Sequence, residues 1–206
     1  MPAYDAILFD FDGVLADTEP LHYRCWKEII APYGIDLAWE TYAGAFIGIH
    51  DDLMLAEFCK QATPPVEFQT LKDHYPRKRD RFRELVLREL PFFPRCREFL
   101  DSLHATKLAV VTSSGRSEIE PALDRAGLLD CFATLVYGGD VRKQKPSPEP
   151  YLLAASRLHA QHPLVIEDSE AGVQSARAAG FDVIQVTSPS EVPAAVQMRL
   201  RSGLDS

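Results

Sequence analysis

Short apolar runs recur along the chain and predict buried β-strands. Five of them occupy residues 6–9, 107–111, 132–137, 164–166 and 183–186. The first run is apolar at every position, which is typical of a strand that is buried on both faces of a parallel sheet. Between the later runs the pattern changes to stretches with helical signals. Alternating strands and helices predict an α/β fold with a doubly wound parallel sheet.

Start and stop signals frame the helices of the C-terminal half. Ser117–Glu120 reads as a capping box, and Gly127 stands where the helix after it would end. Ser147 followed by Pro148 predicts another N-terminus, with serine as the N-cap and proline at the first helical position. A further helix is expected to end at Gly180, and the last residues of the chain are expected to form one more.

Residues 17–90 interrupt this alternation. They carry helical patterns separated by turn signals near 32–34, 44–48 and 63–65, and no strand pattern lies between them. A block of this kind, placed between the first strand and the remaining α/β units, predicts an all-helical cap domain inserted into a core formed by residues 1–16 and 91–206. The expected hinges are 13–17 and 90–94.

Composition excludes several classes of protein. Of the 206 residues, 46% are hydrophobic and 25% are charged, which are globular values, and the formal net charge is −8. A negative chain is a poor general binder of nucleic acid, but local cations still permit a small anionic substrate. No membrane span or signal peptide is predicted. The cysteines are too scattered for a zinc site, so reduced thiols and a cytoplasmic location are expected.

Acidic residues directly follow the first predicted strand. Asp10 and Asp12 follow the apolar run directly, and Gly13 comes next. Carboxylates at the mouth of a buried strand need pairing or a metal ion. Thr112 and Asp168 also follow strands, and side chains at the carboxyl ends of parallel strands converge in space. An ionised aspartate can attack phosphorus, and Mg²⁺, which prefers oxygen ligands, would offset the repulsion between the two anions.

Four spaced motifs together give the chain a resemblance to a known family. They are Asp10–Gly13, the strand end at Thr112, Lys145-Pro146 before a helix, and Glu167-Asp168 at the end of another strand. In this order they resemble the haloacid dehalogenase-like phosphohydrolase superfamily, and more closely its helical-cap branch, which includes β-phosphoglucomutase and sugar-phosphate phosphatases. The resemblance implies a Rossmann-like core and covers nearly the whole chain.

The resemblance also implies roles for these residues. Asp10 would be the nucleophile of a two-step displacement through an aspartyl-phosphate, and Asp12 the general acid and base. Lys145 and Thr112 would stabilise the charge on the nucleophile and the phosphoryl oxygens. The ligands expected for Mg²⁺ are Asp10, Asp168, the backbone carbonyl of Asp12 and Glu167. Glu167 could equally contact the ligands of the ion without binding the ion itself.

Substrate choice is expected to depend on the cap and on the loop after Thr112. Candidate substrate-binding residues are His22, Lys78, Ser113, Ser114 and Arg116. His22 could instead be a packed histidine. Lys78 belongs to the basic stretch 77–81, most of which would be a solvated helix face.

One departure from the family pattern bears on the reaction. In the loop Gly48-Ile49-His50-Asp51, Asp51 occupies the place where the mutase carries an arginine that grips a second phosphate. A carboxylate there would repel a second phosphate. The sequence therefore favours a Mg²⁺-dependent phosphatase that acts, as a monomer, on a small phosphorylated metabolite such as a sugar or polyol phosphate. A phosphosugar mutase and a non-catalytic binding protein are the alternatives.

Overall fold

The computed structural model describes residues 4–47, 49 and 51–202, and the chain divides into two compact units. One unit, here called the core unit, runs up to Asp17 and resumes at Leu90. The other, the cap unit, is Thr18–Glu89. Gly48 and His50, which belong to the loop discussed above, lie outside the described residues.

The core unit is built on five parallel strands. Their order is β3-β2-β1-β4-β5, which confirms the doubly wound parallel sheet predicted from the sequence. The strands are β1 (Ala6–Phe9), β2 (Lys107–Val111), β3 (Thr134–Val136), β4 (Pro163–Glu167) and β5 (Asp182–Gln185). Strand β1 lies at the centre and is fully buried, as its unbroken apolar run requires.

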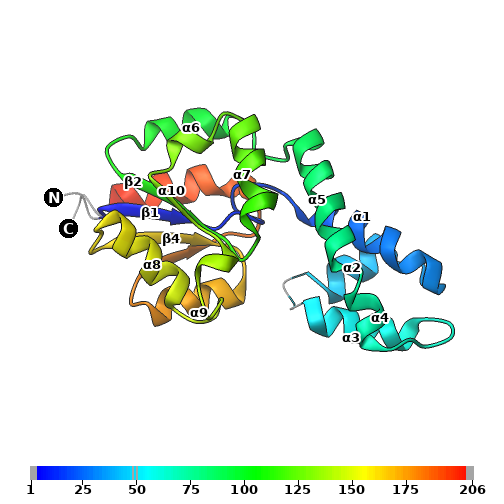
Figure 1. The fold of residues 1–206 in the computed structure, drawn as a ribbon. Helices are drawn as coiled ribbons and strands as arrows, with labels where there is room; N and C mark the ends of the chain where they lie inside the picture. The colour runs from blue at the N-terminus through cyan, green and yellow to red at the C-terminus, as the bar shows by residue number, and fades with distance from the viewer. Residues whose placement is uncertain (1–3, 48, 50, 203–206) are drawn as a thin grey trace. The chain divides into compact units, whose positions relative to one another are not determined.

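Helices cover both faces of this sheet (Figure 1). They are α6 (Cys96–Ser102), α7 (Arg116–Arg125), α8 (Glu149–Leu158), α9 (Glu170–Ala178) and α10 (Val192–Ser202). Figure 1 shows α6 and α8 on opposite sides of the strands. Apolar side chains of α8 and α9 pack with those of β1, β2 and β4 in one buried cluster, so α8 is held firmly against the sheet.

The capping box predicted at Ser117–Glu120 is wrong by two residues. Helix α7 begins at Arg116, and the backbone N–H of Gly115 donates to Glu118 at 2.8 Å. Glu120 is engaged elsewhere, because its carboxylate accepts from Arg116 and from the Tyr137 hydroxyl. Local spacing identified the helix but not which of two glutamates would turn back to its start.

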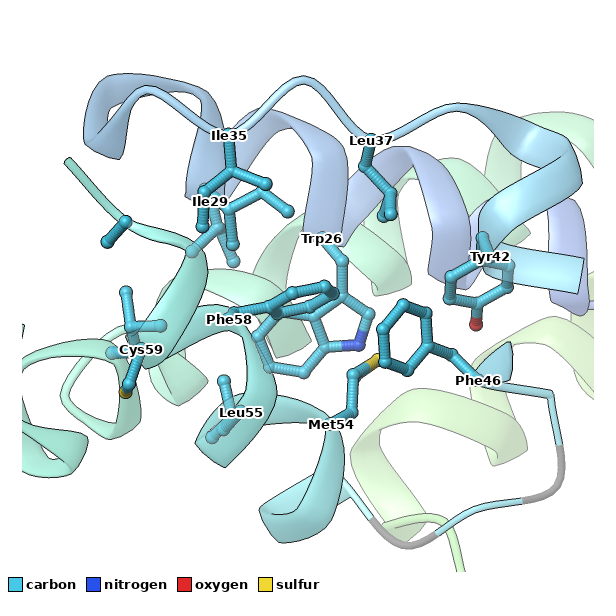
Figure 2. Close-up of a cluster of buried hydrophobic side chains, with 13 residues drawn as sticks. Trp26, Ile29, Ile35, Leu37, Tyr42, Phe46, Met54, Leu55, Phe58 and Cys59 are labelled. Atoms are coloured by element: carbon cyan, nitrogen blue, oxygen red, sulfur yellow. The ribbon is translucent and has the colours of Figure 1, made fainter. Parts of the chain in front are cut away.

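Every regular element within the described residues of the cap unit is a helix. The elements are α1 (Glu19–Ile30), α2 (Trp39–Ala45), α3 (Asp51–Gln61), α4 (Phe68–Lys72) and α5 (Tyr75–Glu89), with a short 3₁₀ turn at Ala31–Tyr33. Their apolar faces meet in a cluster of buried side chains around Trp26, Phe46 and Phe58 (Figure 2). The cap unit thus has a hydrophobic core of its own.

The chain leaves and re-enters the core unit through one pair of neighbouring segments. The Asp17 N–H donates to the carbonyl of Pro91 at 2.8 Å, and Ala16 pairs with Phe92 in an antiparallel bridge. The two linkers therefore lie side by side at the point where the cap unit begins and ends. In the described part of the chain, no helix combines the length and the apolar content needed to cross a membrane. All four cysteines are free thiols.

Candidate active site

Three neighbouring strands deliver the polar residues to one edge of the sheet. Phe9 of β1 lies in register with Val110 of β2 and Ile166 of β4, so Asp10 follows β1 beside the end of β4. The Asp10 N–H continues the ladder by donating to the Ile166 carbonyl at 3.0 Å. The buried ladder therefore fixes the backbone of Asp10 before its side chain makes any contact.

Lys145 joins the strand ends through three short hydrogen bonds. Its Nζ donates to Asp10 Oδ1 at 2.6 Å, to Glu167 Oε1 at 2.5 Å and to the Val111 carbonyl at 3.0 Å. These bonds use all three hydrogens of the ammonium group. Burial alone would lower the pKa of Lys145, but the Asp10 and Glu167 carboxylates raise it, so the side chain stays charged.

Asp10, Glu167 and Asp168 form a compact acidic group. One oxygen from each of them lies within 4.8 Å of the others. Burial, reinforced by the neighbouring acids, raises the pKa of Asp10 well above its usual range even though Lys145 acts in the opposite direction. Burial and repulsion from Glu167 and Asp12 raise the pKa of Asp168 to about 7. The carboxylate oxygens repel one another, and a divalent cation such as Mg²⁺, which prefers oxygen ligands, would offset this repulsion.

Glu167 differs from the other two acids because it is fully enclosed by donors. Burial would raise its pKa, but hydrogen bonds from Lys145, Tyr151 and Ser169 hold the pKa below its ordinary value. Its side chain is 0% exposed. A Cβ added at Gly172 would lie 1.7 Å from Glu167 Oε1, so only glycine leaves room for this carboxylate at the start of α9.

Gly13 has a comparable relation to Asp168. Its φ of +70° is a conformation that side chains rarely adopt. A Cβ at this position would also lie 2.0 Å from Asp168 Oδ2. The tight turn after Asp12 therefore brings bare backbone against the Asp168 carboxylate.

Asp12 is held from the loop after β2. The Ser114 hydroxyl donates to Asp12 Oδ2 at 2.9 Å, and the Ser114 N–H donates to Thr112 Oγ1 at 3.0 Å. Thr112 Oγ1 accepts this bond, and the same hydroxyl group also carries one hydrogen that it can donate. Thr112 is buried, and its own N–H donates to the Val136 carbonyl. The structure thus connects Asp12, Ser114 and Thr112.

The other substrate-binding candidates of the core unit are not in this network. Ser113 is exposed. The Arg116 guanidinium pairs with Glu120 at 2.8 Å and lies over the Tyr137 ring, 4.6 Å from its centroid. The contacts of Arg116 therefore keep it on the surface of α7.

Both candidates of the cap unit gather around Phe82. The His22 ring stacks on the Phe82 ring with centroids 4.3 Å apart. Lys78 is only 6% exposed, and its Nζ lies 5.6 Å from the ring centroids of both Trp26 and Phe82. Asp51 begins α3, and its carboxylate is hydrogen-bonded to the Tyr75 side chain.

Sequence reasoning missed three residues that shape the acidic group, namely Tyr151, Ser169 and Gly172. Tyr151 donates its hydroxyl to Glu167, Ser169 donates both its N–H and its hydroxyl, and Gly172 leaves the necessary space. Ser169 could have been found from the sequence, since a serine directly after a strand and before a helix is a typical N-cap. Nothing in the local pattern around Tyr151 or Gly172 indicates their contacts.

Comparisons with known proteins agree with this arrangement. The model of the haloacid dehalogenase-like hydrolase family matches residues 7–186. A phosphorylated carbohydrates phosphatase of Thermotoga maritima is 31% identical over 87% of this chain and 83% of its own length. The fructose-1-phosphate phosphatase YqaB of Escherichia coli is 31% identical over 89% of this chain and 96% of its own.

A solved structure leads to the same family. The crystal structure of a candidate β-phosphoglucomutase, also from Thermotoga maritima, superposes with a TM-score of 0.70 at 26% identity, covering 94% of this chain and 99% of that one. The resemblance inferred from the four sequence motifs is thereby confirmed. The chain belongs to the haloacid dehalogenase-like hydrolase family.

Proposed function

We propose that this hydrolase is a Mg²⁺-dependent phosphatase of a small phosphorylated metabolite, such as a sugar or polyol phosphate. The single observation that carries the proposal is the buried Lys145 ammonium bound to Asp10 beside the acidic group. Two similar proteins are named as phosphatases of carbohydrate phosphates, which supports the same substrate class.

The proposed reaction has two displacements. In the first, an Asp10 carboxylate oxygen attacks phosphorus, the bond from phosphorus to the ester oxygen breaks, and Asp12 gives its proton to that leaving oxygen. In the second, water attacks the phosphorus of the aspartyl-phosphate, Asp12 takes a proton from the water, and Asp10 is released with inorganic phosphate. The Ser114 hydroxyl, which donates to Asp12, would orient it for both proton transfers.

Mg²⁺ would be held by the carboxylates of Asp10 and Asp168 and by the backbone carbonyl of Asp12. The residues fit such an ion, because burial and mutual repulsion already work against the ionised forms of Asp10 and Asp168. When bound, it supplies positive charge that offsets the repulsion between nucleophile and phosphoryl group. Lys145 supplies a second positive charge at Asp10, and Thr112 donates a hydrogen bond to the phosphoryl oxygens.

His22, Lys78, Ser113, Ser114 and Arg116 remain the proposed substrate-binding residues. Lys78 has the strongest physical support among them. Its ammonium group is buried against ring faces, and no carboxylate pairs with it among the described residues. A buried cation of this kind favours an anionic substrate group over a neutral one.

The test is an assay of inorganic phosphate release from a panel of phosphorylated metabolites, with and without Mg²⁺. We expect turnover of one or more sugar or polyol monophosphates that requires Mg²⁺. Asp12→Ala should lower kcat by about 10²–10⁴-fold, the usual value of a general acid or base. Asp124→Ala, which removes an exposed aspartate on α7, should leave kcat unchanged. Interconversion of hexose 1- and 6-phosphates without net phosphate release would contradict the phosphatase assignment.

Mg²⁺ binding should depend on pH because Asp168 titrates near neutrality. Its pKa is raised to about 7, against about 3.9 in an unfolded chain, so the folded metal-free protein binds more protons than the unfolded one between these values. The stability of the metal-free protein should therefore fall as pH rises from about 4 through about 7. A proton on Asp168 also competes with the ion.

We accordingly expect Mg²⁺ to raise the melting temperature more at about pH 8 than at about pH 5.5. Differential scanning fluorimetry with and without the ion measures both shifts. In Asp168→Asn the difference between the two pH values should shrink, and what is left is due to the other acids of the site, Asp10 first, whose pKa is also raised. Equal shifts at both pH values in the unmodified protein would contradict the assignment of Asp168.

A further inference from the structure

Tyr151 is a buried residue of α8 that contacts both charged partners at the centre of the site. Its hydroxyl donates to Glu167 Oε1 at 2.7 Å, and this same oxygen accepts from Lys145 Nζ at 2.5 Å. The Tyr151 ring also lies beneath the Lys145 ammonium group, 5.1 Å from Nζ to the ring centroid. Neither the sequence motifs nor the proposed chemistry assigns a role to this side chain.

The carboxylate of Glu167 has no acceptor capacity left for another group. Oε1 accepts from Lys145 and Tyr151, while Oε2 accepts from the Asp168 N–H at 3.0 Å, the Ser169 N–H at 3.1 Å and the Ser169 hydroxyl at 3.0 Å. A carboxylate offers about four lone-pair sites, and all of them are engaged by these donors. Glu167 is thus arranged to hold Lys145, and it could bind a metal ion directly only by giving up a donor.

Each of the three Lys145 hydrogens has one acceptor, so Lys145 is shared between two buried carboxylates. A hydroxyl that donates to one of these carboxylates disperses part of its charge. The attraction of Glu167 for the ammonium group is then weaker, so more of the Lys145 charge acts on Asp10. Without the hydroxyl, Glu167 would attract Lys145 more strongly and Asp10 would lose part of its charge partner.

We propose that Tyr151 is a positioning residue that acts through Glu167 to hold the Lys145 ammonium group against Asp10. This inference rests on the proposed function, because the consequence for rate arises only where Asp10 is the nucleophile. Phenylalanine at this position would fill the same space and pack in the same cluster with α8 and the sheet, but it would lack the hydrogen bond.

Tyr151→Phe is the direct kinetic test. We expect kcat for phosphate release to fall about tenfold, the rate equivalent of one hydrogen bond to a charged group. KM should change by less than about twofold, because Tyr151 acts on Glu167 and Lys145 and is not one of the proposed substrate-binding residues. The dissociation constant of Mg²⁺, measured by calorimetry without substrate, should also stay within about twofold. A smaller folded fraction would also lower the apparent kcat at constant KM, so kcat is calculated per Mg²⁺-binding site counted in the same calorimetric titration.

Tyr4→Phe is the matched control. Tyr4 also donates its hydroxyl to a carboxylate, that of Asp182 at 2.6 Å, but it precedes the amino end of β1, opposite the site. Loss of the Tyr4 hydroxyl should leave kcat unchanged. Wild-type turnover with an unchanged kcat in Tyr151→Phe would overturn the inference and leave the proposed function standing. Failure of the wild type to release phosphate from any ester would overturn the proposed function instead.

A second measurement does not need turnover. The ammonium hydrogens of Lys145 are buried and hydrogen-bonded, so they should exchange slowly enough for observation by ¹H–¹⁵N NMR. In Tyr151→Phe the Lys145 Nζ resonance should shift and its hydrogens should exchange faster, whereas Tyr4→Phe should change neither. An unaltered Lys145 resonance in Tyr151→Phe would overturn the inference even if no substrate had been found.

Discussion

Asp10→Asn is expected to abolish phosphate release, lowering kcat by about 10⁴-fold or more, which is the scale of losing a catalytic nucleophile. The amide is nearly the same size as the carboxylate, and its oxygen can still accept from Lys145, so the fold should persist. What the variant lacks is the negative charge and nucleophilicity needed to attack phosphorus. Steady-state release of inorganic phosphate measures the loss, and circular dichroism verifies the fold.

The control for this variant is Asp182→Asn. Asp182 begins β5, and its exposed carboxylate pairs with Tyr4 and Arg199. An exposed pair contributes little to stability, so the variant should retain wild-type activity. If Asp10→Asn kept more than a few per cent of the wild-type rate, the covalent mechanism would have to be abandoned.

Lys145→Met should damage both activity and stability. The substitution keeps an unbranched apolar chain but leaves the Asp10 and Glu167 carboxylates buried without their cation. Breaking a buried ion pair from one side costs about 3–5 kcal/mol of unfolding free energy. Urea denaturation should show this loss in the metal-free protein, and phosphate release should fall below detection because Asp10 is no longer held by a charge.

Lys143→Met separates this effect from the loss of a lysine in the same loop. The Lys143 side chain is exposed, and its backbone N–H, which donates to Glu149, is kept in the variant. Its unfolding free energy should stay within about 0.5 kcal/mol of the wild type. A Lys145→Met protein as stable as this control would mean that the carboxylates around Lys145 are neutral in the folded state.

The sequence was most informative where a residue type and its place in an element point to the same conclusion. The apolar run before Asp10 predicted a strand buried on both faces, and the parallel sheet places Asp10 beside the ends of β2 and β4, which Thr112 and Asp168 follow. Strand ends in a parallel sheet share one edge, so the convergence of Asp10, Thr112 and Asp168 follows from topology, whereas Lys145 reaches Asp10 from the loop before α8.

Contacts that depend on side-chain direction could not be predicted. Whether Glu167 binds an ion depends on how many hydrogen-bond donors surround its carboxylate oxygens. Two of these donors are Tyr151 of α8 and Ser169, which precedes α9. Periodicity places Tyr151 on the inner face of a helix but does not tell a packed ring from a ring whose hydroxyl has a partner. The roles of His22, Lys78, Ser113, Ser114, Arg116 and Asp51 toward a substrate stay predictions for a similar reason.

The paired linkers also matter for how such a protein could diversify. One hydrogen bond joins Asp17 to Pro91, and one antiparallel bridge joins Ala16 to Phe92. The two ends of the cap unit therefore leave the core unit side by side, as the two ends of a loop would. An insert of another length could occupy this place without any strand of the sheet changing its neighbour. If the cap unit sets substrate choice, as the sequence predicts, exchange of the insert would change selectivity without moving Asp10, Lys145 or Asp168 in the core unit.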